Sequence, residues 1–188
     1  MKADTGATRA RIVAAARTEF AAHGLAGARV DRISASASAS KERLYAYFGD
    51  KESLFRAAVE DGFDRFQDTV PFTVDNLGLF AARAYRHLCS EPEEHRILLW
   101  ALLQGDPNMH HGAKIGAIVA GHAAAVAQAQ RDGTVETSIQ AQDLMTLVFG
   151  IVSSWITTPG QSLPAGPAEI DRRCEVIEAA VRRLCAVT

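Results

Sequence analysis

The sequence of 188 residues contains little that would place it in a membrane. Its longest apolar stretch covers only 13 residues, 144–156, and includes one glycine and three hydroxyl side chains. A membrane-spanning helix needs about 20 apolar residues. Near the N-terminus, the apolar residues 12–16 are followed at once by Arg17 and Glu19, so no signal peptide is visible. We therefore expect a cytoplasmic protein without a membrane partner.

Cysteine is scarce, and the histidines are poorly spaced for metal binding. The three cysteines are widely separated and form no Cys-x-x-Cys pair (Cys89, Cys174, Cys185), which argues against a disulfide framework and a structural zinc site. His110 and His111 are neighbours, so on a helix they would point about 100° apart. His111 and His122 would lie about 16 Å apart along a helix axis. We expect neither a metal nor another cofactor.

Sequence motifs typical of enzymes are also missing. The sequence has no His-Glu-x-x-His, no Gly-x-Ser-x-Gly and no phosphate-binding loop. These absences disfavour a small all-helical enzyme, which is one alternative for this chain. We expect no catalytic residues and no enzymatic activity.

The charge is unevenly distributed along the chain. Residues 1–60 contain ten Lys and Arg against seven Asp and Glu, so this segment has a formal charge of +3. The remaining 128 residues contain ten against fifteen, a formal charge of −5. A modest basic excess is weak evidence for a nucleic-acid partner, because solvated charged faces are common. Its position at the N-terminal end is more informative than its size.

Helix-forming residues are abundant throughout the chain. Ala is frequent, and no run of alternating β-branched residues predicts a strand. We predict an all-α protein of about nine helices, at residues 8–23, 30–37, 40–48, 51–67, 74–89, 93–104, 108–131, 138–157 and 168–187.

The first fifty residues contain two short predicted helices after a longer one. In the first helix, Ile12, Ala16 and Phe20 lie on one face, and Gly24 is placed to end it. Ser40 is a natural N-cap for the third helix. Two short helices joined by a tight turn are typical of a helix-turn-helix module, whose second helix enters the major groove of DNA.

The residues of this segment sharpen that interpretation. The stretch "TRARIVAAARTEFAAHG…VDRIS…ASASKERLYAYFGDKESLF" resembles the N-terminal domain of TetR-family repressors. The family pattern Val-x-x-Ile-Ala, Ala-Gly-Val-Ser, Leu-Tyr-x-His/Tyr-Phe and Lys-x-x-Leu is matched in unbroken register by Val30, Ile33, Ala37, Ser40, Leu44, Tyr45, Tyr47, Phe48, Lys51 and Leu54. The resemblance implies a DNA-binding domain at residues 1–52 and a larger helical domain for effector binding and dimerisation at 53–188.

Two positions depart from the family pattern. The turn has Ser38 and Ala39 where the family usually has Gly and Val, and a left-handed conformation would cost Ser more than Gly. Arg29 replaces the Ser or Thr that often caps the second helix near a phosphate, so a hydroxyl cap is lost and a longer cationic side chain is gained. Both changes make the DNA sequence preference harder to predict.

The resemblance also implies a set of DNA contacts. Lys41, Glu42 and Arg43, which follow the N-cap Ser40, would face the bases. An Arg can bind guanine through two hydrogen bonds. Phosphate contacts are predicted for four further side chains, which would position the protein without reading sequence: Arg29, Tyr45, Tyr47 and Lys51. The alternative is that the two tyrosines pack ordinarily and that residues 41–43 are a solvated face.

The second half of the chain has no recognisable motif. Two helical seams with spacings of three and four residues favour a dimer, because a helix-turn-helix protein usually binds two half-sites; alternatively, both seams face the core of their own subunit. The seam residues are Leu144, Val148, Ile151, Trp155, Ile170, Cys174, Ile177, Val181 and Leu184. Candidates for lining an effector pocket are aromatic and small polar residues: Phe66, Tyr85, Trp100, Met109, His122, Phe149 and Ser153.

Taken together, the sequence predicts a sequence-specific DNA-binding transcriptional regulator. By resemblance, it would be a repressor that binds a palindromic operator in double-stranded DNA as a homodimer. An unknown small-molecule effector would shift the helix at 51–67 and release the operator, which requires different affinities for the two conformations. A DNA-binding factor without an effector is the remaining alternative.

Overall fold

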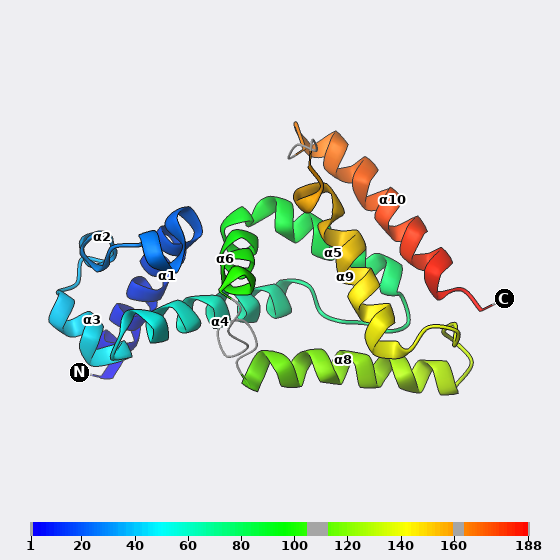
Figure 1. Ribbon diagram of the computed structural model, residues 1–188, viewed down its shortest axis with the longest axis horizontal. Helices are drawn as coiled ribbons and strands as arrows, with labels where there is room; N and C mark the ends of the chain where they lie inside the picture. Colours follow the sequence, from blue (N-terminus) through cyan, green and yellow to red (C-terminus); the bar gives the residue numbers. More distant parts are fainter. Residues whose placement is uncertain (1, 105–112, 160–163, 188) are drawn as a thin grey trace. The chain divides into compact units, whose positions relative to one another are not determined.

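The computed structural model describes residues 2–104, 113–159 and 164–187, and within these ranges every regular element is a helix (Figure 1). The nine helices in these ranges confirm the predicted all-α fold. Their bounds are α1 Lys2–Gly27, α2 Val30–Ser36, α3 Lys41–Phe48, α4 Lys51–Thr69, α5 Leu77–Ser90, α6 Pro92–Leu103, α8 Ala113–Arg131, α9 Ala141–Thr157 and α10 Pro167–Cys185. Most ends agree with the predicted ranges within three residues. Helix α1 differs more, because it begins six residues before the predicted 8 and ends four residues after the predicted 23. The predicted start of the helix at 108–131 lies outside the described residues.

The chain packs into two compact units, and each unit is built from two separate segments of the sequence. Unit 1 comprises the described parts of residues 1–65 and 91–115, and unit 2 comprises those of 66–90 and 116–188. Helix α6 therefore belongs to the same compact unit as the predicted helix-turn-helix. The functional boundary at 52/53 stays a prediction, because packing does not test which residues bind DNA.

The core of unit 1 is built by α1, α2, α3, the first part of α4 and α6. Apolar side chains from all of these helices are buried together, including Phe20, Ile33, Leu44, Phe55 and Ile97. Phe20 and Phe55 meet edge to face, with their ring centroids 5.0 Å apart. Their burial follows from the apolar periodicity of each helix.

The core of unit 2 is formed mainly by α5, α9 and α10, with residues of α8 and the segment after α4. Helix α10 packs along α5 and also contacts α9 (Figure 1). The close approach of α5 and α10 requires Gly78, because a Cβ there would lie 2.8 Å from the backbone oxygen of Glu178. Tyr85, Phe80, Leu144 and Ile177 are fully buried in this core.

The turn between α2 and α3 contains a residue in the left-handed conformation, which costs Ser more than Gly. Ser38 has a positive φ of 49°, and its N–H donates to the carbonyl of Ala35 while Ala39 donates to Ser34. This pair of bonds, with a left-handed residue just after the helix, is the Schellman helix ending that usually takes Gly. The chain thus ends α2 with this motif although the left-handed position is occupied by Ser.

We expect Ser38→Gly to raise the free energy of unfolding by about 0.5–1 kcal/mol, because Gly adopts this φ without the steric cost that a Cβ carries. Ser36→Gly is the matched control, since Ser36 is an exposed helical residue two positions earlier. There, Gly should lower stability by roughly 0.5 kcal/mol. Urea unfolding of both variants measures the effects, and destabilisation by Ser38→Gly would contradict the prediction.

Candidate nucleic-acid interface

Helix α3 is anchored by its buried face and exposes the opposite face to solvent. Leu44 and Phe48 are buried in the core of unit 1. At its start, the Ser40 hydroxyl accepts a hydrogen bond from the backbone N–H of Arg43 at 3.2 Å, as the sequence predicts for an N-cap. Lys41, Glu42 and Arg43 are all exposed in the first turn. This is the part of a recognition helix that meets base edges in helix-turn-helix proteins.

Lys41 and Glu42 are held by neighbours other than Arg43. The Lys41 ammonium forms an ion pair with Asp31 on α2, and the pKa of Lys41 is raised by its hydrogen bond to that carboxylate. The pKa of Glu42 is lowered, first by a backbone N–H at the helix start and then by the Ser40 hydroxyl. The exposed guanidinium of Arg43 belongs to none of these interactions.

The start of α2 is held by a carboxylate from α1. An oxygen of Glu19 accepts a hydrogen bond from the Arg29 N–H at 2.8 Å, and the same carboxylate accepts hydrogen bonds from Nε and Nη2 of the Arg32 guanidinium. Glu19 thus ties the N-cap residue Arg29 and the Arg32 side chain to α1, whereas no side chain makes a capping hydrogen bond from position 29. Sequence reasoning missed Glu19, because its role depends on a contact across ten residues.

The pKa of Glu19 is lowered, chiefly by the hydrogen bond from Arg32. A carboxylate with a lowered pKa in the folded state stabilises the fold above its unfolded pKa, and this stabilisation is lost as the pH falls through the folded pKa. We expect Glu19→Gln to lower stability at pH 7 by up to about 1 kcal/mol. The difference from the wild type should shrink once the pH falls below about 4. Urea unfolding at several pH values, with the exposed Glu175→Gln as control, measures this; a difference independent of pH would contradict it.

The remaining predicted DNA contacts differ in exposure. Arg29 is exposed, and so is Tyr45, with 44% of its surface accessible. Tyr47 is half-buried and packs against the core of unit 1, so part of its side chain serves ordinary packing. The ammonium of Lys51 donates to the carbonyl of Ala26 at 3.4 Å. These four side chains and Ser40 all lie in unit 1, and their DNA contacts stay predictions.

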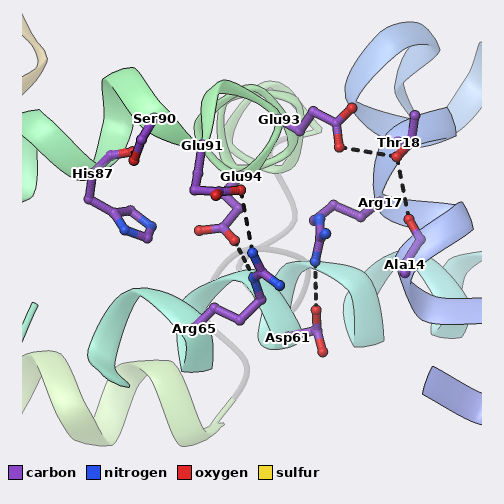
Figure 2. Close-up of polar contacts among 10 residues, drawn as sticks. All are labelled: Ala14, Arg17, Thr18, Asp61, Arg65, His87, Ser90, Glu91, Glu93 and Glu94. Atoms are coloured by element: carbon purple, nitrogen blue, oxygen red, sulfur yellow. Dashed lines mark hydrogen bonds and ion pairs between the residues drawn. The ribbon is translucent and has the colours of Figure 1, made fainter. Parts of the chain in front are cut away.

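Helix α6 extends this unit beyond the predicted three-helix domain (Figure 2). The Thr18 hydroxyl of α1 donates to a carboxylate oxygen of Glu93 on α6 at 3.0 Å. Arg17 of α1 pairs with Asp61 of α4 at 2.9 Å. Polar contacts therefore connect α1 to both α4 and α6.

A second group of contacts joins α4 to α6. Arg65 donates through Nε to Glu94 at 2.6 Å and lies 3.4 Å from Glu91 (Figure 2). Glu94 is buried, with 8% of its surface accessible. A buried carboxylate needs such a partner, because leaving it unpaired is costly. The contacts span 26 to 29 residues of sequence, which no local motif reveals.

The predicted pocket residues do not all come together. Phe66, Tyr85, His122, Phe149 and Ser153 lie in unit 2. Trp100 lies in unit 1, where its indole packs against Gly24 of α1. Met109 falls outside the described residues.

Within unit 2, His122 is the centre of an aromatic cluster. Its imidazole stacks on Phe72 with centroids 4.0 Å apart, and Phe80 meets both rings edge-on. The ring of Phe149 meets that of Phe80 edge to face, with centroids 6.0 Å apart. Burial lowers the pKa of His122, which favours the neutral ring, and its buried Nδ1 has no hydrogen-bond partner among the described residues. Phe72 and Phe80 were missed by sequence reasoning.

The predicted dimer-seam residues differ in burial. Five of the seam residues are buried in the core of the chain itself, with at most 6% of their surface accessible: Leu144, Val148, Cys174, Ile177 and Val181. The burial of these five agrees with the alternative of a seam that faces its own core, and a dimer contact by them stays a prediction. Ile151, Trp155, Ile170 and Leu184 are only partly buried against that core. A three–four spacing places residues on one face but does not say what covers it.

Two further features concern metals and membranes. Among the described residues, no group of three or more His, Cys, Asp or Glu side chains is arranged to hold a metal ion. None of the described helices combines the length and apolar character needed to cross a membrane.

Comparison with known proteins identifies the family. Residues 12–58 match the model "Bacterial regulatory proteins, tetR family", and residues 76–183 match "Tetracyclin repressor-like, C-terminal domain". The HTH-type transcriptional repressor SCO4008 of Streptomyces coelicolor is 34% identical over 185 residues, which is 96% of each chain.

Solved structures agree with this assignment. The crystal structure of the transcriptional regulator SCO4942 from Streptomyces coelicolor superposes with a TM-score of 0.80 at 31% identity, covering 96% of this chain and 99% of that one. A TetR-family regulator from Marinobacter aquaeolei VT8 shares the fold with a TM-score of 0.77 at 21% identity, over 100% of both chains. The recognition helix, the two family matches and the full-length relative lead to one conclusion: the chain belongs to the TetR family and is a DNA-binding transcriptional repressor.

Proposed function

We propose that the repressor binds a palindromic operator as a homodimer, reads bases with Arg43 and its neighbours, and is released by a small-molecule effector. The observation that carries the first part is helix α3, whose cap and buried face fix it while Lys41, Glu42 and Arg43 face solvent. Arg43 is the principal base reader, because Lys41 is already paired with Asp31. Arg29, Tyr45, Tyr47 and Lys51 supply phosphate contacts, which position α3 without specifying sequence.

Selection of bound fragments from a random-sequence DNA pool tests the operator proposal. A selected site with two-fold symmetry supports dimeric binding, because each subunit reads one half-site. Affinity that falls steeply with salt supports contacts to several phosphates. Enrichment of an asymmetric site, or no enrichment, contradicts the proposal.

The dimer contact proposed here uses the outer faces of α9 and α10. Leu147 on α9 and Val176 on α10 are large apolar side chains with 46% and 45% of their surface accessible. Regulators of this family act as dimers, and a second copy of the chain is the occupant that fits this role. Sedimentation of Leu147→Asp and of the control Val119→Asp, on α8, tests this contact. Dissociation in the first variant alone supports it, and an unchanged dimer in both contradicts it.

The effector is proposed to bind in unit 2, beside the aromatic cluster around His122. A neutral imidazole with a buried nitrogen that has no partner within the described part of the chain offers a hydrogen bond to an uncharged ligand, and the surrounding rings offer apolar surface. That the protein is cytoplasmic and that it has no enzymatic activity both stay predictions.

A small-molecule screen tests effector control. A true effector raises the melting temperature progressively as its concentration increases, because it binds the folded state. It also releases the selected operator, and His122→Phe should weaken its binding while leaving operator affinity unchanged. Ligands that stabilise the protein without changing operator affinity, or a screen without any stabilising ligand, favour the alternative of a repressor without an effector.

A further inference from the structure

Helix α1 breaks at Gly24, just before the chain turns into α2. Gly24 has φ 64° and ψ 179°, a conformation that L side chains rarely adopt. A Cβ at this position would lie 2.9 Å from two carbon atoms of the Trp100 ring. Two independent features, the backbone conformation and the contact with Trp100, therefore require Gly here.

Trp100 comes from α6 and fills the space that Gly24 leaves. Its indole N–H donates to the carbonyl of Ala21 at 3.3 Å, across 79 residues of sequence. Ala21 lies in the last turn before the break, where helix carbonyls lose their intrahelical partners. Trp100 thus packs on the break and also satisfies one of the carbonyls exposed by it.

The other side of the same corner is held by α1 itself. Glu19 binds the Arg29 N–H and the Arg32 side chain, which fixes the first turn of α2. Ala28, between the break and α2, is buried with 4% of its surface accessible. Because α2 packs on α3 within unit 1, the path of the chain at Gly24 sets where both helices lie.

We propose that Trp100 is a positioning residue for operator binding. It fixes the corner between α1 and α2 from α6, and through α2 it sets the orientation of α3 without touching DNA. The DNA-reading unit is then complete only with a helix supplied by residues 92–103. This inference rests on the DNA binding of the family and not on the proposed effector.

Three variants test this role. Trp100→Ala removes the ring and the hydrogen-bond donor, whereas Trp100→Phe keeps a ring over Gly24 and removes only the donor. Leu103→Ala is a control on the same helix, because Leu103 has 76% of its surface accessible. We expect operator affinity to fall about tenfold or more in Trp100→Ala and less in Trp100→Phe, with the control unchanged. Affinity for a scrambled duplex should stay within about twofold, because phosphate contacts dominate non-specific binding.

A structural role alone would give a different pattern. In that case Trp100→Ala would lower the melting temperature. The ratio of operator affinity to scrambled-DNA affinity would stay unchanged at temperatures where the variant is folded. That unchanged ratio would overturn the proposal. If Trp100→Ala does not fold, Trp100→Phe decides, and wild-type operator affinity in that variant would overturn the proposal as well.

A double-mutant cycle gives a second, independent readout. Gly24→Ala places a methyl group against the Trp100 ring, so it should weaken operator binding in the wild-type background. In the Trp100→Ala background the clash is absent, and the same change should cost several-fold less affinity. Equal costs in both backgrounds would overturn the proposed coupling of these two residues.

Discussion

Arg43→Ala should reduce affinity for the selected operator by roughly 10- to 100-fold, equivalent to about 1–3 kcal/mol. Arg43 is exposed in the first turn of α3, and its backbone N–H is tied to the Ser40 cap. Its side chain is therefore free to extend while its backbone is fixed. A guanidinium presented in this way can form two hydrogen bonds to one guanine, which no other base accepts equally well.

The loss should be specific for one base position. Binding titrations against the operator and against variants with each base pair changed should show relaxed preference at a single symmetric pair of positions. The salt dependence should hardly change, since a base contact releases few counterions. Arg11→Ala is the matched control, because Arg11 is a cation of unit 1 on α1 that already bonds Thr8. Equal losses in the two variants, or a uniform loss over all sequences, would reject base reading by Arg43.

The helix-turn-helix could be predicted in detail because its signals are local. Ser40 caps α3 as predicted, and the four-residue spacing of Ile12, Ala16 and Phe20 correctly placed these side chains on one buried face of α1. The steric cost of a left-handed Ser in this turn could also be stated from the sequence, and Ser38 does have a positive φ of 49°. Each of these features depends on residues that lie close together in the sequence.

Features that depend on distant residues could not be predicted in the same way. Trp100 was interpreted as a pocket residue, yet its partners are Gly24 and Ala21, and nothing in the residues around position 100 indicates them. The seams on α9 and α10 are open to two interpretations for a related reason. Helical periodicity shows that Leu144 and Val148 share a face, but that face can cover the chain's own core or a partner with the same spacing.

Arg173→Ala should lower the free energy of unfolding by about 3–5 kcal/mol, because it removes one partner from a buried polar network. Arg173 has only 3% of its surface accessible. Its guanidinium donates to the Tyr85 hydroxyl at 3.1 Å and to Glu169 at 2.5 Å, and it lies 5.6 Å from the Trp155 ring centroid. Without it, the fully buried Tyr85 loses a hydrogen-bond donor and a cavity opens between α5 and α10.

Arg172→Ala is the matched control for this network. Arg172 is the neighbouring residue, its side chain is 60% exposed, and it approaches the same Glu169 at 3.8 Å. An exposed ion pair of this kind contributes at most about 1 kcal/mol. Arg173→Lys separates charge from geometry, since an ammonium cannot reproduce the fork of the guanidinium. We expect urea unfolding to rank the losses as Arg173→Ala, then Arg173→Lys, then Arg172→Ala. Similar small losses in all three would mean that the buried network contributes no more to stability than a surface ion pair.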